Sequence, residues 1–158
     1  MGILITNLAV SWYNVAVIWL MQLDIYPSWA YVPSEIFGRL QGMHFYQLFL
    51  TVYPQAILAT VLSFVMLRRR PTGVARPLLV SGVVIQCSLW LLTALLWGRW
   101  QGQIALPTST PTPALGPANT ALYETLVQTH WLRVALITAY ALIASTVVRA
   151  ALKEARTQ

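Results

Sequence analysis

A continuous apolar stretch decides the fold of this chain: Pro77-Leu-Leu-Val-Ser-Gly-Val-Val-Ile-Gln-Cys-Ser-Leu-Trp-Leu-Leu-Thr-Ala-Leu-Leu-Trp97. No charged side chain interrupts it between Arg76 and Arg99. An α-helix needs roughly 20 apolar residues to cross the hydrocarbon core of a bilayer, and this stretch supplies them. The apolar residues are continuous and do not alternate with a period of two, which argues against a barrel strand. We therefore predict a membrane-spanning helix over residues 77–97.

Three further apolar stretches have the length of a membrane span, and we expect helices at about residues 3–23, 35–67 and 120–152. The composition agrees, because 58% of the 158 residues are hydrophobic and 9% are charged, whereas a soluble domain carries about 25% charged residues. A soluble enzyme, a zinc-finger module and a disordered tail are excluded. The sequence predicts an all-α fold, a four-transmembrane-helix bundle in which residues 1–158 form a single membrane domain.

Basic residues predict the orientation of the bundle. They gather in the second connection and at the carboxyl end: Arg68, Arg69, Arg70, Arg76, Arg149, Lys153 and Arg156. Cytoplasmic segments of membrane proteins carry such an excess, so we expect both termini to be cytoplasmic and the protein to lie in the cell (inner) membrane. The net charge of +6 then faces anionic lipid headgroups, and we expect no nucleic-acid partner. The first stretch lacks a basic leader and a small-residue cleavage site, which indicates a retained span.

Five residues predict local features of these helices. Ser34 and Thr120 have the chemistry of helix N-caps. Pro77 suits the first turn of a helix, and Gly98 suits a helix stop. Pro54 lies in the middle of the second span, where its missing N–H predicts a kink.

Two connections, residues 24–33 and about 100–119, belong to the non-cytoplasmic side. The second contains Pro107, Pro111, Pro113 and Pro117, and we expect it to be extended or polyproline-like. Aromatic residues crowd the same end of the bundle: Tyr26, Trp29, Tyr31, Trp97, Trp100, Tyr123 and Trp131. They form either an ordinary interfacial belt or the walls of a site for a flat hydrophobic ligand. For the second alternative the candidate binding residues are Trp90, Trp97, Tyr123 and Trp131.

Each predicted helix has one polar edge, as expected for four helices around a shared interior. The polar residues are Asn7, Ser11 and Asn14; Gln41, His44, Thr51 and Gln55; Gln86 and Thr93; and Tyr123, His130, Arg133 and Tyr140. Hydrogen bonds between helices account for most such residues, at about 0.6–2 kcal/mol per contact.

His44 and His130 lie at a similar depth, roughly 15 Å below the caps of their helices at 1.5 Å per residue. Arg133 follows His130 by one turn. Three interpretations stay open for the histidines. They form a general acid/base pair that works with Arg133, or they ligate a metal ion or haem, or they are satisfied by Glu35, Glu124 or Gln41. A haem needs only an axial pair, whereas a zinc ion needs three or four protein ligands. The single cysteine, Cys87, excludes an internal disulfide and a cysteine-only metal site.

Two stretches resemble a family of small four-helix membrane proteins that includes the anthrone-oxygenase-like proteins. The first contains Gln22-Leu-Asp-Ile-Tyr26-Pro27, Val32-Pro33 and the segment from Phe37 to His44. The second is Leu126-Val-Gln-Thr-His130-Trp131-Leu-Arg133, which is similar to an Asn-Trp-x-Arg segment of that family, with His130 in place of Asn. The resemblance implies a membrane oxygenase or oxidoreductase that acts on aromatic, anthrone- or quinone-like compounds without a nucleotide cofactor.

The residues themselves favour the same chemistry. In an outward-facing pocket lined by aromatic side chains, a histidine would take a proton and Arg133 would stabilise the resulting enolate or phenolate. One alternative function is a non-catalytic structural or accessory subunit of a larger membrane complex, respiratory or photosynthetic. A second is a haem- or pigment-binding protein that uses His44 and His130. The expected partners are the lipid bilayer, a lipophilic small molecule, and other membrane subunits or a second copy of the chain.

Overall fold

The computed structural model describes residues 1–106 and 112–157. About 85% of the chain is helical, and no β-strand occurs in the described part. Four helices are long and apolar enough to cross a membrane: Gly2–Trp29, Ser34–Arg69, Arg76–Gln103 and Thr120–Thr157. The all-α fold and the four apolar helices predicted from the sequence are therefore confirmed.

Three of the four helices contain internal irregularities. The first is built from α1 (Gly2–Leu20), the π-helical η1 (Met21–Ile25) and α2 (Tyr26–Trp29). The second consists of α3 (Ser34–Thr51) and α4 (Tyr53–Arg69). The third joins α5 (Arg76–Leu92), the π-helical η2 (Thr93–Trp97) and α6 (Gly98–Gln103), and the fourth is the single helix α7 (Thr120–Thr157).

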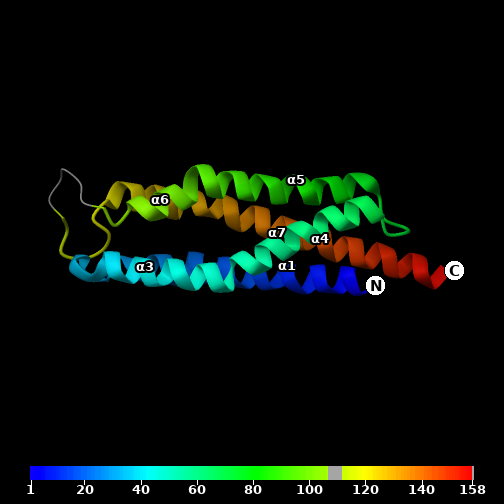
Figure 1. Cartoon of the computed structure of the whole chain (residues 1–158), viewed down its shortest axis with the longest axis horizontal. Helices are drawn as coiled ribbons and strands as arrows, with labels where there is room; N and C mark the ends of the chain where they lie inside the picture. The colour runs from blue at the N-terminus through cyan, green and yellow to red at the C-terminus, as the bar shows by residue number, and fades with distance from the viewer. Residues whose placement is uncertain (107–111, 158) are drawn as a thin grey trace.

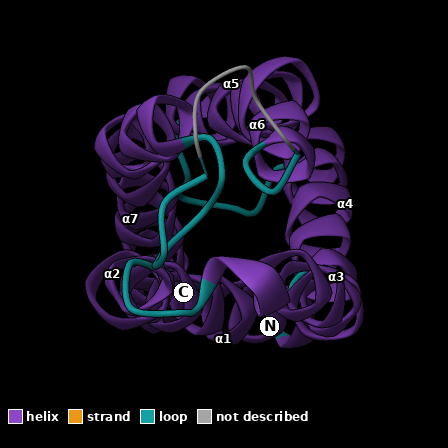
Figure 2. Cartoon of the chain, turned by 90° about the vertical axis from the view of Figure 1, so that its left-hand side faces the viewer, coloured by secondary structure: helices purple, strands orange, loops and turns teal. Residues whose placement is uncertain are grey.

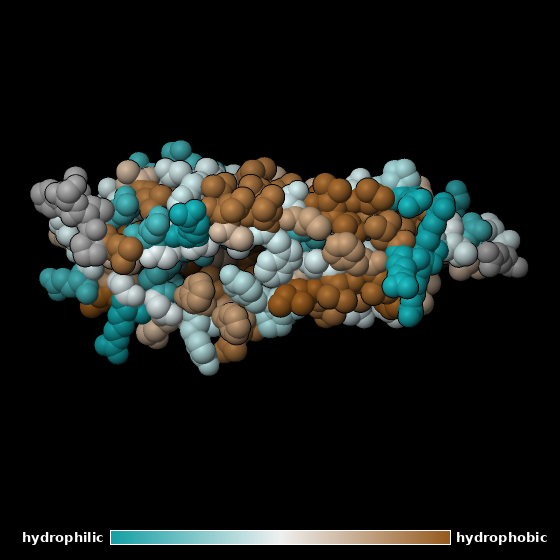
Figure 3. All heavy atoms as spheres, turned by 45° about the horizontal axis from the view of Figure 1, so that its top comes forward, coloured by the Kyte–Doolittle hydropathy of each residue, from teal (hydrophilic) through white to brown (hydrophobic). Residues whose placement is uncertain are grey.

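Both chain termini lie at one end of the bundle, beside the connection between α4 and α5 (Figure 1). We call this the basic end, and we call the opposite end, with the other two connections, the aromatic end. Viewed along the axis, the helices surround a common centre (Figure 2). The surface view shows apolar side chains over the middle of the molecule and hydrophilic ones toward its two ends (Figure 3).

The helices extend further toward the aromatic end than predicted. The first continues to Trp29 rather than stopping near residue 23, and the third continues to Gln103 rather than residue 97. Most of the predicted connection 24–33 is thus helical, and Pro27 lies inside the continuing helix, directly after the π-helical turn η1. Residues 112–119 are non-helical. Of the prolines predicted to be extended, Pro107 and Pro111 lie outside the described residues.

Gly98 is not a helix stop. Its backbone N–H donates to the carbonyl of Thr93, the five-residue spacing of a π-turn. A Cβ atom on Gly98 would lie 2.8 Å from that carbonyl oxygen. The glycine therefore permits a close backbone approach inside a continuing helix, and η2 forms one wall of the interior.

Pro54 breaks the second helix, as predicted. α3 ends at Thr51 and α4 begins at Tyr53, and the helix changes direction there (Figure 1). The helical hydrogen-bond pattern is interrupted here, and the carbonyl of Thr51 accepts a hydrogen bond from the hydroxyl of Tyr13 at 3.2 Å. Beyond the break, α4 packs closely against α1 and α5. In the described part of the chain, α3 does not pack as closely against α5, η2 or α6.

The predicted caps are wrong in detail. The backbone N–H of Leu122 donates to Asn119 Oδ1 at 3.1 Å, so Asn119, not Thr120, caps α7. The backbone N–H of Ser34 donates to the carbonyl of Ala114 at 3.2 Å. Ser34 thus ties the two connections of the aromatic end together instead of capping α3.

Two buried clusters fill the bundle. The aromatic-end cluster contains Ile18, Met21, Tyr26, Trp29, Phe37, Trp97, Ile104, Leu126 and Val134. The basic-end cluster contains Leu4, Met66, Val74, Leu79, Val147 and Ala151. Polar side chains and a cavity lie between them.

We predict that Gly98→Ala lowers the free energy of unfolding by about 1–3 kcal/mol, because the added methyl group collides with a backbone carbonyl that cannot move alone. Gly102→Ala is the matched control, since nothing lies within 4 Å of its new Cβ. The control should be neutral or stabilising by up to about 1 kcal/mol. Thermal unfolding in detergent, followed by circular dichroism, measures both, and equal effects would contradict the role given to η2.

Candidate functional site

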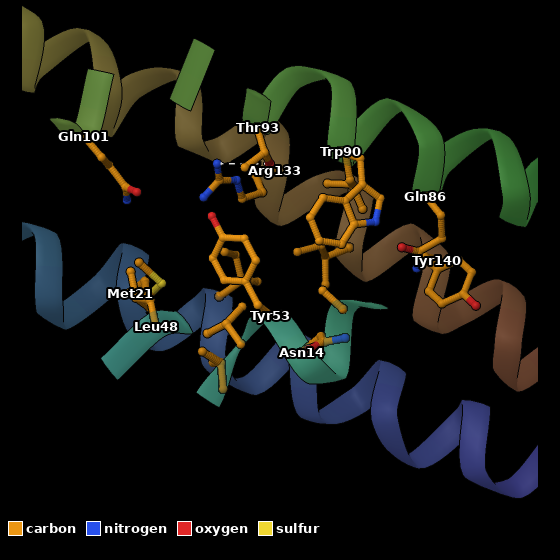
Figure 4. A pocket seen from close by; sticks show the side chains of 16 residues that line it. Asn14, Met21, Leu48, Tyr53, Gln86, Trp90, Thr93, Gln101, Arg133 and Tyr140 are labelled. Atoms are coloured by element: carbon orange, nitrogen blue, oxygen red, sulfur yellow. Dashed lines mark hydrogen bonds between the residues drawn. The ribbon is translucent and has the colours of Figure 1, made fainter. Parts of the chain in front are cut away.

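A cavity of about 110 Å³ lies in the middle of the bundle and is lined by all four helices. Its polar lining comes mainly from Asn14, Tyr53, Trp90, Thr93, Gln101 and Arg133 (Figure 4). A proline and a glycine shape its walls. Tyr53 lies between the helix break and Pro54, and Thr93 accepts the hydrogen bond from Gly98 that closes the π-turn.

Arg133 is the charged group of the cavity. Its Nη2 atom donates to Thr93 Oγ1 at 3.4 Å, and its guanidinium carbon lies 4.3 Å from the centre of the Trp97 ring. Its Nε atom is buried and has no hydrogen-bond partner, and no ion pair of Arg133 occurs within residues 1–106 and 112–157. The phenol of Tyr53 points toward the guanidinium (Figure 4). An unpaired charge inside an apolar bundle is costly, which makes Arg133 a candidate site residue.

Asn14 lines the cavity from α1, on the opposite side from Arg133 (Figure 4). Its Oδ1 atom is buried without a hydrogen-bond partner. Buried polar atoms are otherwise nearly always satisfied. The cavity therefore offers a ligand a free donor at Arg133 and a free acceptor at Asn14.

His130 is completely buried but does not line this cavity. Its Nδ1 atom lies 2.7 Å from Oε1 of Gln22. Because an amide oxygen only accepts, Nδ1 carries the proton, and the buried Nε2 atom is left without a partner. The ring also packs edge-on against Tyr26, with 4.6 Å between centroids.

His44 is half-buried and lies near Trp29, which is a neighbour of Tyr26. Its Nδ1 atom accepts a hydrogen bond from the indole of Trp29 at 3.1 Å, and the two rings stack. Trp29 in turn contacts Tyr26, with 4.9 Å between ring centroids. Each imidazole thus packs against a different member of the Tyr26–Trp29 pair. No hydrogen bond or ring contact joins the two imidazoles in the described part of the chain.

The histidines are hydrogen-bonded, but not by the residues expected from the sequence. Gln22 and Trp29 fill the role expected for Glu35, Glu124 or Gln41. No three His, Cys, Asp or Glu side chains of residues 1–106 and 112–157 come together as a metal site would require. Since both Nδ1 atoms are engaged, a haem or metal would have to use Nε2 of each ring, and ligation by His44 and His130 stays a prediction.

The aromatic candidates have four different positions. Trp90 lines the cavity and donates to Thr60 Oγ1 at 2.8 Å. Trp97 is buried beneath the guanidinium of Arg133, and Tyr123 donates to the backbone carbonyl of Tyr26 at 2.7 Å. Trp131 is 45% exposed and contacts Trp19 on the outside of the bundle. Of the residues predicted for the site, Arg133 and Trp90 thus meet at the cavity and Trp97 supports it.

Two cavity residues were missed from the sequence. Tyr53 lies within an apolar run, which gives no indication of an inward polar group, although its position directly before the mid-span proline could have pointed to it. Gln101 was assigned to a connection, whereas α6 carries it into the bundle, where its Nε2 atom donates to the hydroxyl of Tyr26 at 2.7 Å.

A second polar cluster lies between the cavity and the basic end. The hydroxyl of Tyr140 is 2.6 Å from Ser63 Oγ and 2.8 Å from Asn7 Oδ1. Tyr140 also lines the cavity. The cluster therefore fixes the rotation of α1, α4 and α7 around the cavity.

Comparison of the chain with protein-family models, curated proteins and solved structures finds no match. The resemblance to the anthrone-oxygenase-like family stays a prediction that rests on the two stretches quoted above.

We predict that Tyr140→Phe lowers the free energy of unfolding by about 1 kcal/mol, the usual contribution of a hydrogen bond between membrane helices. Tyr46→Phe is the control, since this side chain is 65% exposed on α3. Chemical unfolding in mixed micelles measures both variants. An equal response would show that the Tyr140 cluster contributes nothing specific.

Proposed function

We propose that this protein binds the oxygen-bearing head of a lipophilic aromatic or quinone-like compound inside the membrane and acts on it as an oxygenase or oxidoreductase. The observation that carries the proposal is Arg133, an unpaired guanidinium with a free N–H that lines a cavity made by all four helices. A keto or phenolate oxygen supplies the acceptor that this N–H lacks.

The surroundings of Arg133 favour an aromatic ligand. Trp90 and Tyr53 line the cavity with their rings and contact each other, with 6.0 Å between centroids. Such faces suit a flat ring. A guanidinium in a site of low polarity also stabilises the negative charge of an enolate or phenolate, which is the form that reacts in oxidations of this class of compound. The reaction class itself rests on the family resemblance.

In this proposal Arg133 is the catalytic residue and His130 is a positioning residue. His130 packs on Tyr26, and the hydroxyl of Tyr26 holds the side chain of Gln101 at the cavity wall. His44 holds Trp29 from the other side of the aromatic pair. The histidines thus support the wall that faces Arg133 and take no proton from the ligand directly.

The orientation in the membrane is part of the same proposal. The basic residues of the α4–α5 connection and of the end of α7 belong to the end that also holds both termini (Figure 1). This asymmetry supports a cytoplasmic basic end in the cell (inner) membrane. The aromatic end then faces the opposite side.

We predict that Arg133→Gln weakens binding of an alkyl-1,4-benzoquinone about 10- to 150-fold. This range corresponds to the loss of a hydrogen bond to a charged group, about 1.5–3 kcal/mol. Equilibrium binding to protein in lipid nanodiscs measures the change. The same experiment with anthrone tests whether a three-ring compound also binds.

Arg149→Gln, an exposed arginine of the same helix, is the matched control and should bind like the wild type. Arg133→Gln should keep the wild-type melting temperature, because the substitution removes a buried charge that has no counter-ion. Unchanged binding in Arg133→Gln, with both proteins folded, would refute the proposed site and favour an accessory role.

The orientation is tested by cysteine labelling in a Cys87→Ser background. Thr112→Cys and Thr72→Cys are both exposed positions, at the aromatic and basic ends respectively. We expect a membrane-impermeant maleimide to label Thr112→Cys in intact cells and Thr72→Cys only after permeabilisation. The reverse pattern would show that the basic end lies outside.

A further inference from the structure

We infer that the cavity is reached from the side, by a molecule already dissolved in the bilayer, through a window between α3 and η2. The inference rests on the proposed function, since it assumes that the cavity binds a lipophilic ligand. It adds the route of entry and the shape of the ligand: a single-ring head inside and an aliphatic tail that stays in the lipid.

The cavity is closed toward the aromatic end. Beyond Ile18 and Met21, which line it, come the buried side chains of Tyr26, Trp29 and Ile104, each at most 1% exposed. The described parts of the two connections are tied together above them. The backbone N–H of Gly116 donates to the carbonyl of Val32 at 2.7 Å, and the backbone N–H of Asn119 donates to the carbonyl of Ile104 at 3.1 Å.

The cavity is also closed toward the basic end. Tyr140 forms its floor, with its hydroxyl engaged by Ser63 and Asn7. Below this layer the basic-end cluster packs without charged members. A lipophilic molecule therefore has no open path along the bundle axis through the described residues.

The side of the cavity at the helix break is open. Leu48, Val52 and Tyr53 all line the cavity and are all partly exposed. α3 does not pack closely against η2 there, whereas α4, beyond the break before Pro54, packs against α5. Two interactions bound the resulting window. Gln41 Nε2 donates to the Gln101 carbonyl at 3.0 Å above it, and the Tyr53–Trp90 ring contact lies below it.

The window has the lining of a lipid-facing passage. Its two boundaries are twelve residues apart along the chain, roughly 18 Å at 1.5 Å per residue. Phe49, which is 56% exposed, contacts Tyr53 beside the opening, and Phe45 lies one turn away on the same face of α3. On the other side Leu91 and Leu95 are exposed. No charged residue occurs in residues 40–67 or 77–98, so an aliphatic chain meets only apolar and neutral side chains here.

The size of the cavity limits what enters. An apolar cavity of about 150 Å³ holds one benzene ring, and this cavity measures about 110 Å³. The cavity thus approaches the size that a single ring needs, whereas the three fused rings of an anthrone need a much wider space. The unpaired Oδ1 atom of Asn14, an acceptor, lies across the cavity from Arg133. A hydroquinone can donate one hydroxyl to this atom while its second oxygen accepts from Arg133, whereas a quinone gains only the hydrogen bond from Arg133.

The test uses a 1,4-benzoquinone with a decyl tail that ends in a diazirine, photolysed with the full-length protein in nanodiscs. We expect the tail to label residues 45–52 or 91–95, as mapped by mass spectrometry. Excess decyl-benzoquinone without the diazirine should suppress this labelling, as should Arg133→Gln, each at least tenfold. Arg149→Gln should leave it unchanged.

The outcomes separate the two proposals. Labelling of residues 24–33 or 112–119 that depends on Arg133 would overturn the window and leave the proposed function intact. Labelling that neither competition nor Arg133→Gln reduces would overturn the proposed function and the window with it. The competition experiment needs no variant, so the result does not depend on the stability of a mutant.

Discussion

The guanidinium of Arg133 has to be compensated inside an apolar bundle without a carboxylate, and much of the surrounding structure meets that requirement. The aromatic face of Trp97 and the hydroxyl of Thr93 each supply part of the compensation, and the phenol of Tyr53 points toward the same group. A cation over an indole gains about 0.5–2 kcal/mol, and a hydrogen bond from a charged group about 1.5–3 kcal/mol. These contributions fall short of the cost of a desolvated charge. The remainder is available to a ligand that brings an acceptor to the free Nε–H.

Departures from regular helix geometry place these partners around the cavity. The π-turn of η2 shifts the register of the third helix, so that Thr93 and Trp97 both reach Arg133. The break before Pro54 turns Tyr53 toward the same group and separates α3 from η2. Four straight helices would close both the cavity and its opening. The helical irregularities thus create the space, and the buried clusters at either end keep it narrow.

The hydrophobicity of the chain and the spacing of its apolar residues predicted the fold class, because both are local properties of the sequence. The four spans, the break at Pro54 and the inward position of Arg133 all follow from the sequence around each residue. Gly98 shows where such reasoning stops, since a glycine after an apolar run has the pattern of a helix end. Only the fold reveals that a carbonyl occupies the space where a Cβ would lie. The partners of His44 and His130 were missed because they depend on how far each helix is rotated. If the first helix were rotated by one residue position, a neighbour of Gln22 would face His130 instead. The spacing of polar residues in the sequence does not determine this rotation.

The two imidazoles illustrate why a residue type rare in spans does not by itself mark the reacting centre. Each histidine uses Nδ1 to fix an aromatic wall or an amide, and neither lines the cavity. Arg133 differs in one physical respect, because its charge is fixed and part of its hydrogen-bonding capacity is unused. A neutral imidazole with one hydrogen bond is tolerated in a bundle interior, but an unpaired guanidinium is retained only where something compensates it. That difference, rather than the depth of the histidines, is the reason that we propose a site at the fourth helix where it faces η2.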